Sequence, residues 1–374
     1  MKIGVLTLPL HTNYGGILQA YALQVVLERM GHDVHVIERK DWPLSIPVQK
    51  IPLYYGKRII KNIIGHKCTI FYERKYNREQ PIIRQYTDKF IKKYIHLAEY
   101  KEFSDIKKSE YDVIVVGSDQ VWRPKYFGLN QIENAYLKFA EGWNIKRISY
   151  AASFGTNEWE YTTKQTTECG RLLRVFDAVS VREDSGVALC ERYFHVKAQH
   201  VLDPTMLLRK EDYIKLFETA NTPKSKGNLL CYILDETEEK RTLIKRVAND
   251  KRLIPFRVNS EVENQQASLS EQIQPPLELW LRGFYDAEFV ITDSFHACVF
   301  SILFQKPFLV CGNKKRGLSR FVSLLTMLEL KENIVNDINE YVYHDIDWKK
   351  VYTKMEVLKK ESNLFLKLGV DSNK

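Results

Sequence analysis

Residues 2–38 have the sequence KIGVLTLPLHTNYGGILQAYALQVVLERMGHDVHVIE and contain a complete strand–helix–strand unit. Residues 2–8 form a short apolar run, which is typical of a buried strand. Residues 16–30 place apolar side chains along a broad helical face, and residues 33–38 form a second apolar run after Gly31 ends the helix. Two strands joined in this way lie parallel in one sheet, so the N-terminus predicts an α/β protein.

The same alternation continues along the chain and restarts once. Further strands are predicted at residues 111–116, 147–153, 178–181 and 200–202. The polar stretch 221–227 contains Pro and Gly and is the best candidate for a linker. After it, strands are predicted at residues 228–234, 254–258, 289–291 and 307–310, with helices at 277–285 and 297–305.

We therefore predict two Rossmann-like domains that face each other across a cleft. The first spans residues 1–220 and carries a basic helical insertion at about 43–105. The second spans residues 225–345, and residues 346–374 form a C-terminal helix. Ligand sites favour the interfaces between domains, so we expect the functional residues in the cleft.

The composition is that of an ordinary globular protein, with 374 residues, 44% hydrophobic and 28% charged. No stretch approaches the ~18 uncharged apolar residues of a membrane span. The N-terminus lacks the apolar core and cleavage site of a signal peptide. The six cysteines form no C-x-x-C pair, which indicates reduced thiols in a cytoplasmic protein.

The net charge of +9 is concentrated in residues 57–93, which contain 11 Lys and Arg against 3 Asp and Glu, interleaved with isoleucine and aromatic residues. Such a segment can make peripheral contact with an anionic membrane or an acidic partner. The alternative is a solvated helical pair over the domain core. No nucleic-acid module accompanies the charge, so we predict no nucleic-acid partner.

The most informative motif is FVITDSFHA at residues 289–297. An apolar strand runs into N-cap residue types, and His296 then falls in the first turn of a helix. Ligands of open α/β sheets bind at this carboxyl edge, where free backbone N–H groups attract anions. The motif favours proton transfer on a negatively charged substrate. The alternative is a capped helix whose histidine only hydrogen-bonds locally.

The turn after the first strand contains Asn13, Tyr14, Gly15 and Gly16. Glycines at this place let the backbone approach a ligand closely. The pattern is not G-x-G-x-x-G, which disfavours a dinucleotide site. Asn13 and Tyr14 either contact an acceptor or simply close the turn.

Two further strands also end in polar residues. In GSDQVWR (117–123), Asp119 can orient a hydroxyl or accept its proton, and Trp122 can stack on a sugar; the alternative is a capped turn with a core tryptophan. In SVREDS (180–185), the fork of Arg182 suits a carboxylate or phosphate, unless it pairs locally with Glu183 or Asp184. No metal-ligand spacing is evident among the nine histidines.

Together these motifs resemble the polysaccharide pyruvyl transferase family. The resemblance rests on NYGGILQAYAL (13–23), GSDQVW (117–122), SYAASFG (149–155), VREDS (181–185), LDPT (202–205) and TDSFHA (292–297), in family order. It implies a fold like that of two-domain GT-B glycosyltransferases. It also implies transfer of a pyruvyl group from phosphoenolpyruvate onto two hydroxyls of a sugar, forming a cyclic ketal in cell-surface polysaccharide synthesis, such as capsule or exopolysaccharide.

The resemblance makes Arg182 a donor-binding residue and His296 the central active-site histidine, with Asp119 as the second choice of base. Many relatives have arginine where this chain has Ser294, so Ser294 is expected in the donor site together with a cation from elsewhere in the chain. The candidates are Arg123, Lys314, Lys315, Arg316 and Arg320. The acceptor is expected at Asn13, Tyr14, Gly15, Gly16 and Trp122.

The expected chemistry uses phosphoenolpyruvate as co-substrate and no metal or other cofactor. The protein is expected in the cytoplasm, with residues 57–93 contacting the inner face of the membrane if the sugar acceptor is lipid-linked. Two alternatives stay open: a nucleotide-sugar glycosyltransferase of the same architecture, and a non-catalytic subunit of glycan assembly.

Overall fold

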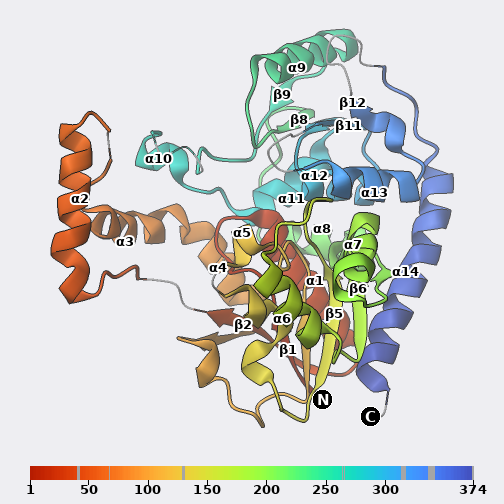
Figure 1. The fold of residues 1–374 in the computed structure, drawn as a ribbon. Helices are drawn as coiled ribbons and strands as arrows, with labels where there is room; N and C mark the ends of the chain where they lie inside the picture. The colour runs from red at the N-terminus through yellow and green to blue at the C-terminus, as the bar shows by residue number, and fades with distance from the viewer. Residues whose placement is uncertain are drawn as a thin grey trace.

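The computed structural model describes residues 1–39, 43–66, 68–128, 131–262, 264, 266–312, 317–335 and 342–372 (Figure 1). Within these residues the strands form two sheets, one of seven strands in the order β3-β2-β1-β4-β5-β6-β7 and one of five in the order β12-β11-β10-β8-β9. Every recorded strand pairing is parallel. The prediction of an α/β protein with two Rossmann-like, GT-B-like units is confirmed.

The first sheet has helices on both faces, with buried strands at its centre and partly exposed strands at its two edges. Its strands are β1 (Lys2–Leu6), β2 (Asp33–Arg39), β3 (Leu97–Tyr100), β4 (Val113–Val116), β5 (Lys146–Ala152), β6 (Ala178–Val181) and β7 (Gln199–His200). Its helices include α1 (Tyr14–Arg29), α5 (Pro124–Phe127), α6 (Thr163–Leu173), α7 (Asp184–Leu189) and α8 (Lys210–Thr219). Helix α1 begins after Asn13 because the Asn13 side chain accepts a hydrogen bond from the Gly16 N–H (3.2 Å).

The second sheet is smaller and has β10 at its centre. Its strands are β8 (Leu229–Tyr232), β9 (Pro255–Phe256), β10 (Phe289–Thr292), β11 (Phe308–Cys311) and β12 (Ile334–Val335). Its helices are α9 (Glu238–Lys251), α10 (Leu269–Gln272), α11 (Leu277–Asp286), α12 (Phe295–Leu303) and α13 (Ser319–Met327). Every residue of β10 and α12 is buried, as expected for a parallel strand and its following helix in a core.

The C-terminal helix α14 (Trp348–Asp371) crosses from the second domain back to the first (Figure 1). Near its start, the Tyr352 hydroxyl donates to the Leu303 carbonyl (3.3 Å). Further along, Ser362 Oγ accepts from the Leu202 N–H (3.0 Å), and Gly369 packs closely against Ala178. Helix α14 therefore connects the two domains.

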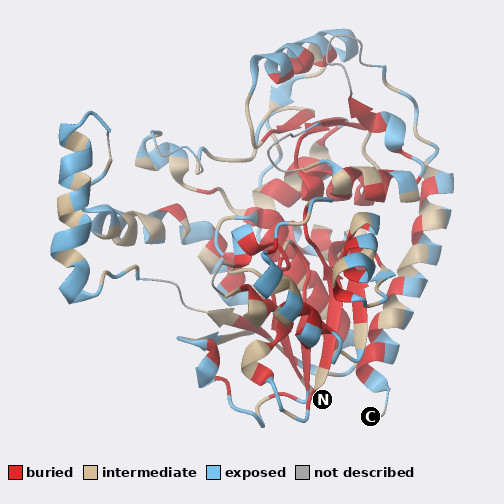
Figure 2. Cartoon of the chain, viewed as in Figure 1, coloured by how far each residue is buried: buried red, intermediate tan, exposed pale blue. Residues whose placement is uncertain are grey.

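The basic insertion is only partly a layer over the core. Helix α4 (Gln85–Tyr94) packs on α1 through buried side chains that include Phe90 and Ile91. Helices α2 (Ile51–Ile63) and α3 (Tyr72–Ile83) stand away from the body of the protein and are largely exposed (Figures 1 and 2). Strand β3 lies within the predicted insertion yet pairs with β2 in the first sheet, so the helical part is shorter than predicted.

Candidate active site

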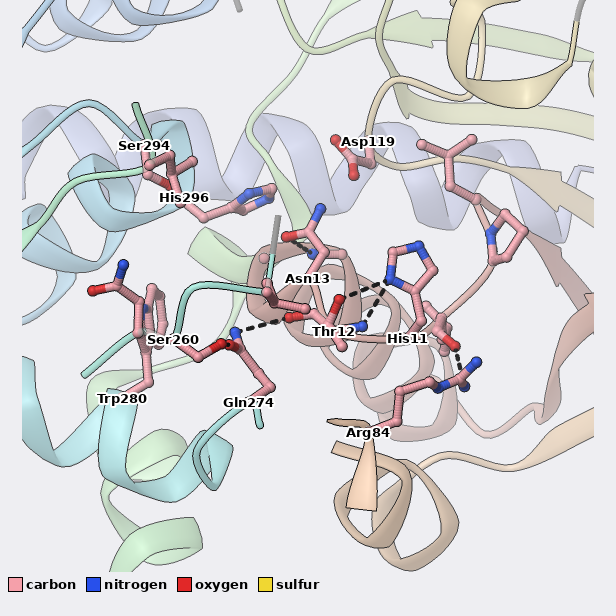
Figure 3. Close-up of a pocket in the computed structure, with 18 of the residues that line it drawn as sticks. His11, Thr12, Asn13, Arg84, Asp119, Ser260, Gln274, Trp280, Ser294 and His296 are labelled. Carbon is pink, nitrogen blue, oxygen red and sulfur yellow. Dashed lines mark hydrogen bonds between the residues drawn. The ribbon is translucent and has the colours of Figure 1, made fainter. Parts of the chain in front are cut away.

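The carboxyl ends of the two sheets border a cavity of about 1910 Å³ (Figure 3). The first domain contributes Asn13, Gly15, Gly16 and Asp119 to its wall, and the second contributes Ser294, Phe295, His296 and Arg320. No helix in the described part of the chain has the length and apolar character needed to cross a bilayer.

His296 lies in the first turn of α12, where the sequence predicted it. Strand β10 ends at Thr292, whose Oγ1 accepts from the N–H of Ser294, the N-cap residue of α12 (3.0 Å). The His296 side chain is 8% exposed and crosses to the first domain. A Cβ on Gly15 would lie 2.0 Å from His296 Nδ1, so the absence of a side chain at Gly15 makes room for the imidazole.

His296 Nε2 points toward a buried ionic cluster. It lies 3.5 Å from Arg182 Nη1 and 3.6 Å from Asp203 Oδ2. The Arg182 guanidinium also lies over the Phe295 ring, 4.7 Å from its centroid. The structure thus brings together the histidine and the arginine that the sequence analysis placed in separate domains.

Arg182 sits directly behind the cavity wall rather than in it, and its side chain is 1% exposed. Nη1 donates to Asp203 Oδ2 (2.6 Å) and Nη2 to Asp119 Oδ1 (3.2 Å). Burial alone would lower the pKa of Arg182, but the two carboxylates raise it. Its Nε has no hydrogen-bond partner among the described residues. Arg182 is therefore not part of the cavity wall, and its role in binding the donor stays a prediction.

Asp203 is the site residue that the sequence analysis missed. Its Oδ1 accepts from both the N–H (3.0 Å) and the hydroxyl (2.6 Å) of Thr205, while Oδ2 faces Arg182 and His296. Burial would raise the pKa of Asp203, but His296, Arg182 and Thr205 hold it well below its usual range. The signal in the sequence was an aspartate after a predicted strand, at the same sheet edge as Arg182.

Asp119 faces the cavity near His296 (Figure 3). Its backbone has φ 63°, a left-handed conformation that aspartate tolerates better than most residues. Burial would raise the pKa of Asp119, but Arg182, His296 and Arg320 lower it. The group is an ionised carboxylate, able to accept a hydrogen bond from a hydroxyl.

Among the cations considered for the position beside Ser294, the structure brings Arg320 to the site. Arg320, from α13, lines the cavity with its guanidinium 5.3 Å from the centroid of the Phe295 ring. Burial, and next the charge of Arg182, lower the pKa of Arg320 to about 10, which leaves it charged at neutral pH. Arg123 instead pairs with Glu160 through Nε (2.9 Å) and Nη2 (2.7 Å). Lys314, Lys315 and Arg316 lie outside the described residues.

The family model for polysaccharide pyruvyl transferase matches residues 13–315. The chain belongs to the polysaccharide pyruvyl transferase family. No curated protein matches the chain by sequence.

Solved structures similar to this pyruvyl transferase family member share little sequence with it. They include ADP-heptose LPS heptosyltransferase II of E. coli (13% identity, 96% of this chain and 99% of that one, TM-score 0.39). UDP-GlcNAc 2-epimerase of Methanocaldococcus jannaschii has 11% identity over 96% and 93% of the two chains, with a TM-score of 0.44. Arabidopsis thaliana UGT89C1, solved with UDP-L-rhamnose, has 10% identity over 97% and 99%, with a TM-score of 0.46.

The residues expected to bind the acceptor fall into two groups in this family member. Asn13, Gly15 and Gly16 line the cavity, with Asn13 also capping α1. Tyr14 is buried between the domains, where its hydroxyl donates to the Pro275 carbonyl (2.6 Å). Its expected acceptor contact is therefore corrected to a contact between domains.

Trp122 is also corrected, from an acceptor platform to a core residue. The side chain is fully buried and stacks on Tyr136 at 5.1 Å with an interplanar angle of 12°. Its Nε1 donates to the Ala135 carbonyl (3.2 Å). The structure therefore agrees with the alternative interpretation of the 117–123 motif, in which Trp122 is a core residue.

The cavity wall also contains polar residues that carried no sequence signal. Gln274 Nε2 donates to the Thr12 carbonyl (3.0 Å), and the Ser260 hydroxyl donates to Gln274 Oε1 (2.5 Å; Figure 3). The side of the cavity formed by the second domain also carries several acidic residues, namely Asp235, Glu236, Glu239 and Glu261. In the described residues no group of three or more His, Cys, Asp or Glu could hold a metal ion.

Proposed function

We propose that this protein transfers the pyruvyl group of phosphoenolpyruvate onto two hydroxyls of a sugar, forming a cyclic ketal during the synthesis of a cell-surface polysaccharide. Membership of the polysaccharide pyruvyl transferase family supports the transferase class and a polysaccharide acceptor. The observation that carries the proposal is His296 at the wall of the interdomain cavity, 3.5 Å from the Arg182 guanidinium.

The donor carries a phosphate and a carboxylate and needs fixed positive groups. We place it against Arg320 and the first turn of α12, because a guanidinium and free helical N–H groups both favour anions. Arg320 then takes the place of the arginine that many relatives have at Ser294. Arg182 acts one layer behind, as a positioning residue that fixes the cluster around His296.

The reaction begins when the methylene carbon of phosphoenolpyruvate gains a proton, which makes the neighbouring carbon electrophilic. A sugar hydroxyl adds there and gives up its proton. The bond from that carbon to the phosphate oxygen then breaks and inorganic phosphate leaves. The second hydroxyl adds to the same carbon and gives up its proton to the phosphate or to a basic side chain, which closes the ketal. Because His296 lines the cavity while Asp203 and Arg182 hold its Nε2 side, we assign the proton transfer to this imidazole. Acid–base catalysis of this kind contributes about 10²–10⁴-fold in rate.

Asp119 is the second group that can take a proton from the acceptor or orient its hydroxyl, since its ionised carboxylate reaches the cavity. The sugar would lie along Asn13, Gly15 and Gly16, opposite α12. No step in this scheme needs a metal or another cofactor. All six cysteines are free thiols, which fits the cytoplasmic location that we propose.

The test is incubation of the purified chain with phosphoenolpyruvate and a panel of lipid-linked and aryl sugars. We expect phosphate release together with the mass gain of one ketal-linked pyruvyl group on a sugar. The His296→Ala variant should stay folded and lose transfer. Near-normal turnover by that variant would overturn the assignment.

The glycosyltransferase alternative is less well supported. The family model that matches the chain is that of polysaccharide pyruvyl transferase, which favours pyruvyl transfer over glycosyl transfer. A thermal-shift comparison separates the two enzymes, because phosphoenolpyruvate should stabilise the protein whereas UDP and GDP should not. A non-catalytic assembly subunit would bind the acceptor without releasing phosphate from any donor.

A further inference from the structure

Helix α2 is an unusual surface element because each of its residues is at least partly exposed. It stands with α3 as an arm beside the body of the protein, pale blue and tan along its length (Figures 1 and 2). A helix in water is normally stabilised by burying an apolar face. The outward face of α2 carries apolar residues that could be buried in this way, but it packs against nothing in the described part of the chain.

The outward face is apolar along one line. Leu53, Ile60 and Ile64 follow each other at spacings of seven and four residues, which places them on one side of the helix. They are 56%, 57% and 68% exposed, and Ile63 beside them is 79% exposed. We call these four residues the α2 face.

The charge around the α2 face has a single sign. Residues 42–72 contain five Lys and Arg and no Asp or Glu. Lys57 and Lys61 are exposed and follow the line of the α2 face along one flank. Lysines at this place can keep their ammonium groups in a lipid headgroup layer while their stems lie along the apolar surface.

The opposite side of α2 is fixed to the start of α3 and to the segment just before it. Arg58 donates through both Nη atoms to the Glu73 carboxylate at 2.7 Å each. Asn62 exchanges two hydrogen bonds with the backbone of Cys68 (2.7 and 2.8 Å), and Tyr55 packs edge-on against Phe71 at 5.1 Å. These contacts hold the α2 face outward.

We propose that the α2 face docks in the plane of an anionic lipid bilayer. An apolar line flanked by lysines is the pattern of a helix that lies at the boundary of headgroups and acyl chains. Anionic headgroups complement the charge of residues 42–72. A second copy of the chain is a poorer occupant, since two arms of the same positive charge would repel each other.

The end of α3 nearest the body of the protein borders the cavity. Tyr76, Gln80 and Pro81 of α3, and Arg84 after it, line the same cavity as His296. A docked arm would bring this opening near the membrane surface, where a lipid-linked sugar acceptor would arrive. That last step rests on the proposed function, whereas the docking itself does not.

The experiment is flotation of the full chain with vesicles of phosphatidylcholine, alone or mixed with phosphatidylglycerol. We expect binding to the mixed vesicles only, lost when NaCl rises from about 0.1 M to about 1 M. Lys57→Glu and Lys61→Glu should each weaken binding about fivefold or more, and Ile60→Asp with Ile63→Asp should abolish it. The matched controls are Val357→Asp and Lys360→Glu on α14, both exposed, which should bind like the wild type.

Several results of the flotation experiment would overturn the proposal. Equal binding to both vesicles, no binding by the wild type, or arm variants that bind like the wild type would overturn the proposal. So would a dimer in light scattering that Ile60→Asp dissociates while no vesicle binds, because the α2 face would then join two copies. Phosphate release with a water-soluble acceptor, measured on the same variants, should be unchanged. Vesicle binding without any transfer would refute the proposed function and leave the docking intact.

Discussion

Asp203 connects the two residues on which the proposed chemistry depends, because one of its oxygens faces both Arg182 and His296. We expect Asp203→Asn to lower kcat by about 10²-fold or more, since the amide cannot balance the charge of Arg182 or support a protonated imidazole. The KM for phosphoenolpyruvate should change less. Thr205→Val, which removes only the hydroxyl bonded to Asp203, serves as the graded control and should cost much less. A drop in stability with unchanged kcat would show that Asp203 is only structural.

The ionised state of Asp203 also predicts a dependence of stability on pH. Its pKa in the folded protein is lowered below the value of about 3.9 in an unfolded chain. A group of this kind stabilises the fold fully above the unfolded pKa, and the contribution is lost as pH falls toward the folded pKa. The free energy of unfolding of the wild type should therefore exceed that of Asp203→Asn near pH 7, and the difference should shrink below about pH 4. Denaturant titrations at both pH values measure it; a constant difference would contradict the prediction.

Arg320 predicts a change in donor binding rather than in chemistry. We expect Arg320→Gln to raise the KM for phosphoenolpyruvate at least about tenfold, because a charged hydrogen bond to an anion is lost. The comparison variant is Arg123→Gln, whose guanidinium is bound to Glu160. It should affect stability and leave KM near the wild-type value. The opposite ranking of the two variants would assign the donor cation to Arg123.

At the N-terminus of α1, we expect substitutions of the two adjacent glycines to have different effects on catalysis. A Cβ on Gly15 would meet His296 Nδ1 at 2.0 Å, whereas one on Gly16 would meet only Asn13, at 3.4 Å or more. Gly15→Ala should displace the imidazole and lower kcat about 10²-fold, the usual cost of a misplaced catalytic group. Gly16→Ala leaves the imidazole in place and should lower kcat much less, even where it weakens acceptor binding. The measurement is the steady-state kcat of the two variants. Equal values would mean that the N-terminus of α1 does not position His296.

The elements that the sequence predicted well are those whose signals are local. The β1–α1–β2 unit and the passage from β10 to α12 each combine an apolar period with a cap or a glycine, so the sequence alone is enough to place His296 in the first turn of α12. Asp203 was missed although a strand was predicted at residues 200–202, because only the pairing of β7 with β6 brings Asp203 to the sheet edge beside Arg182. Strand β3 was hidden inside the basic insertion for the same reason, since only pairing with β2 identifies it.

Across the whole molecule, the sequence could not show which side chains of one domain meet those of the other. Tyr14 and Trp122 lie in the same motifs as cavity residues such as Asn13 and Asp119. Tyr14 nevertheless contacts the other domain, and Trp122 packs in the core. Their place depends on contacts between segments far apart in the chain. The approach of Arg182 and His296, 114 residues apart in sequence, is likewise a property of the assembled cleft.

Helix α14 is where the integrity of the assembled cleft can be tested, because it contacts both domains. Leu366 on this helix is fully buried, so Leu366→Ala should reduce the free energy of unfolding by about 2–5 kcal/mol. Leu364→Ala, at a position 55% exposed on the same helix, should change the free energy of unfolding by less than about 0.5 kcal/mol.

If α14 couples the domains, the wild type unfolds in one calorimetric transition, and Leu366→Ala either lowers the temperature of that transition or splits it in two. Two transitions already present in the wild type would mean that each domain is stable without α14, and that the cavity depends on the direct contacts between Tyr14, Gln274 and their partners.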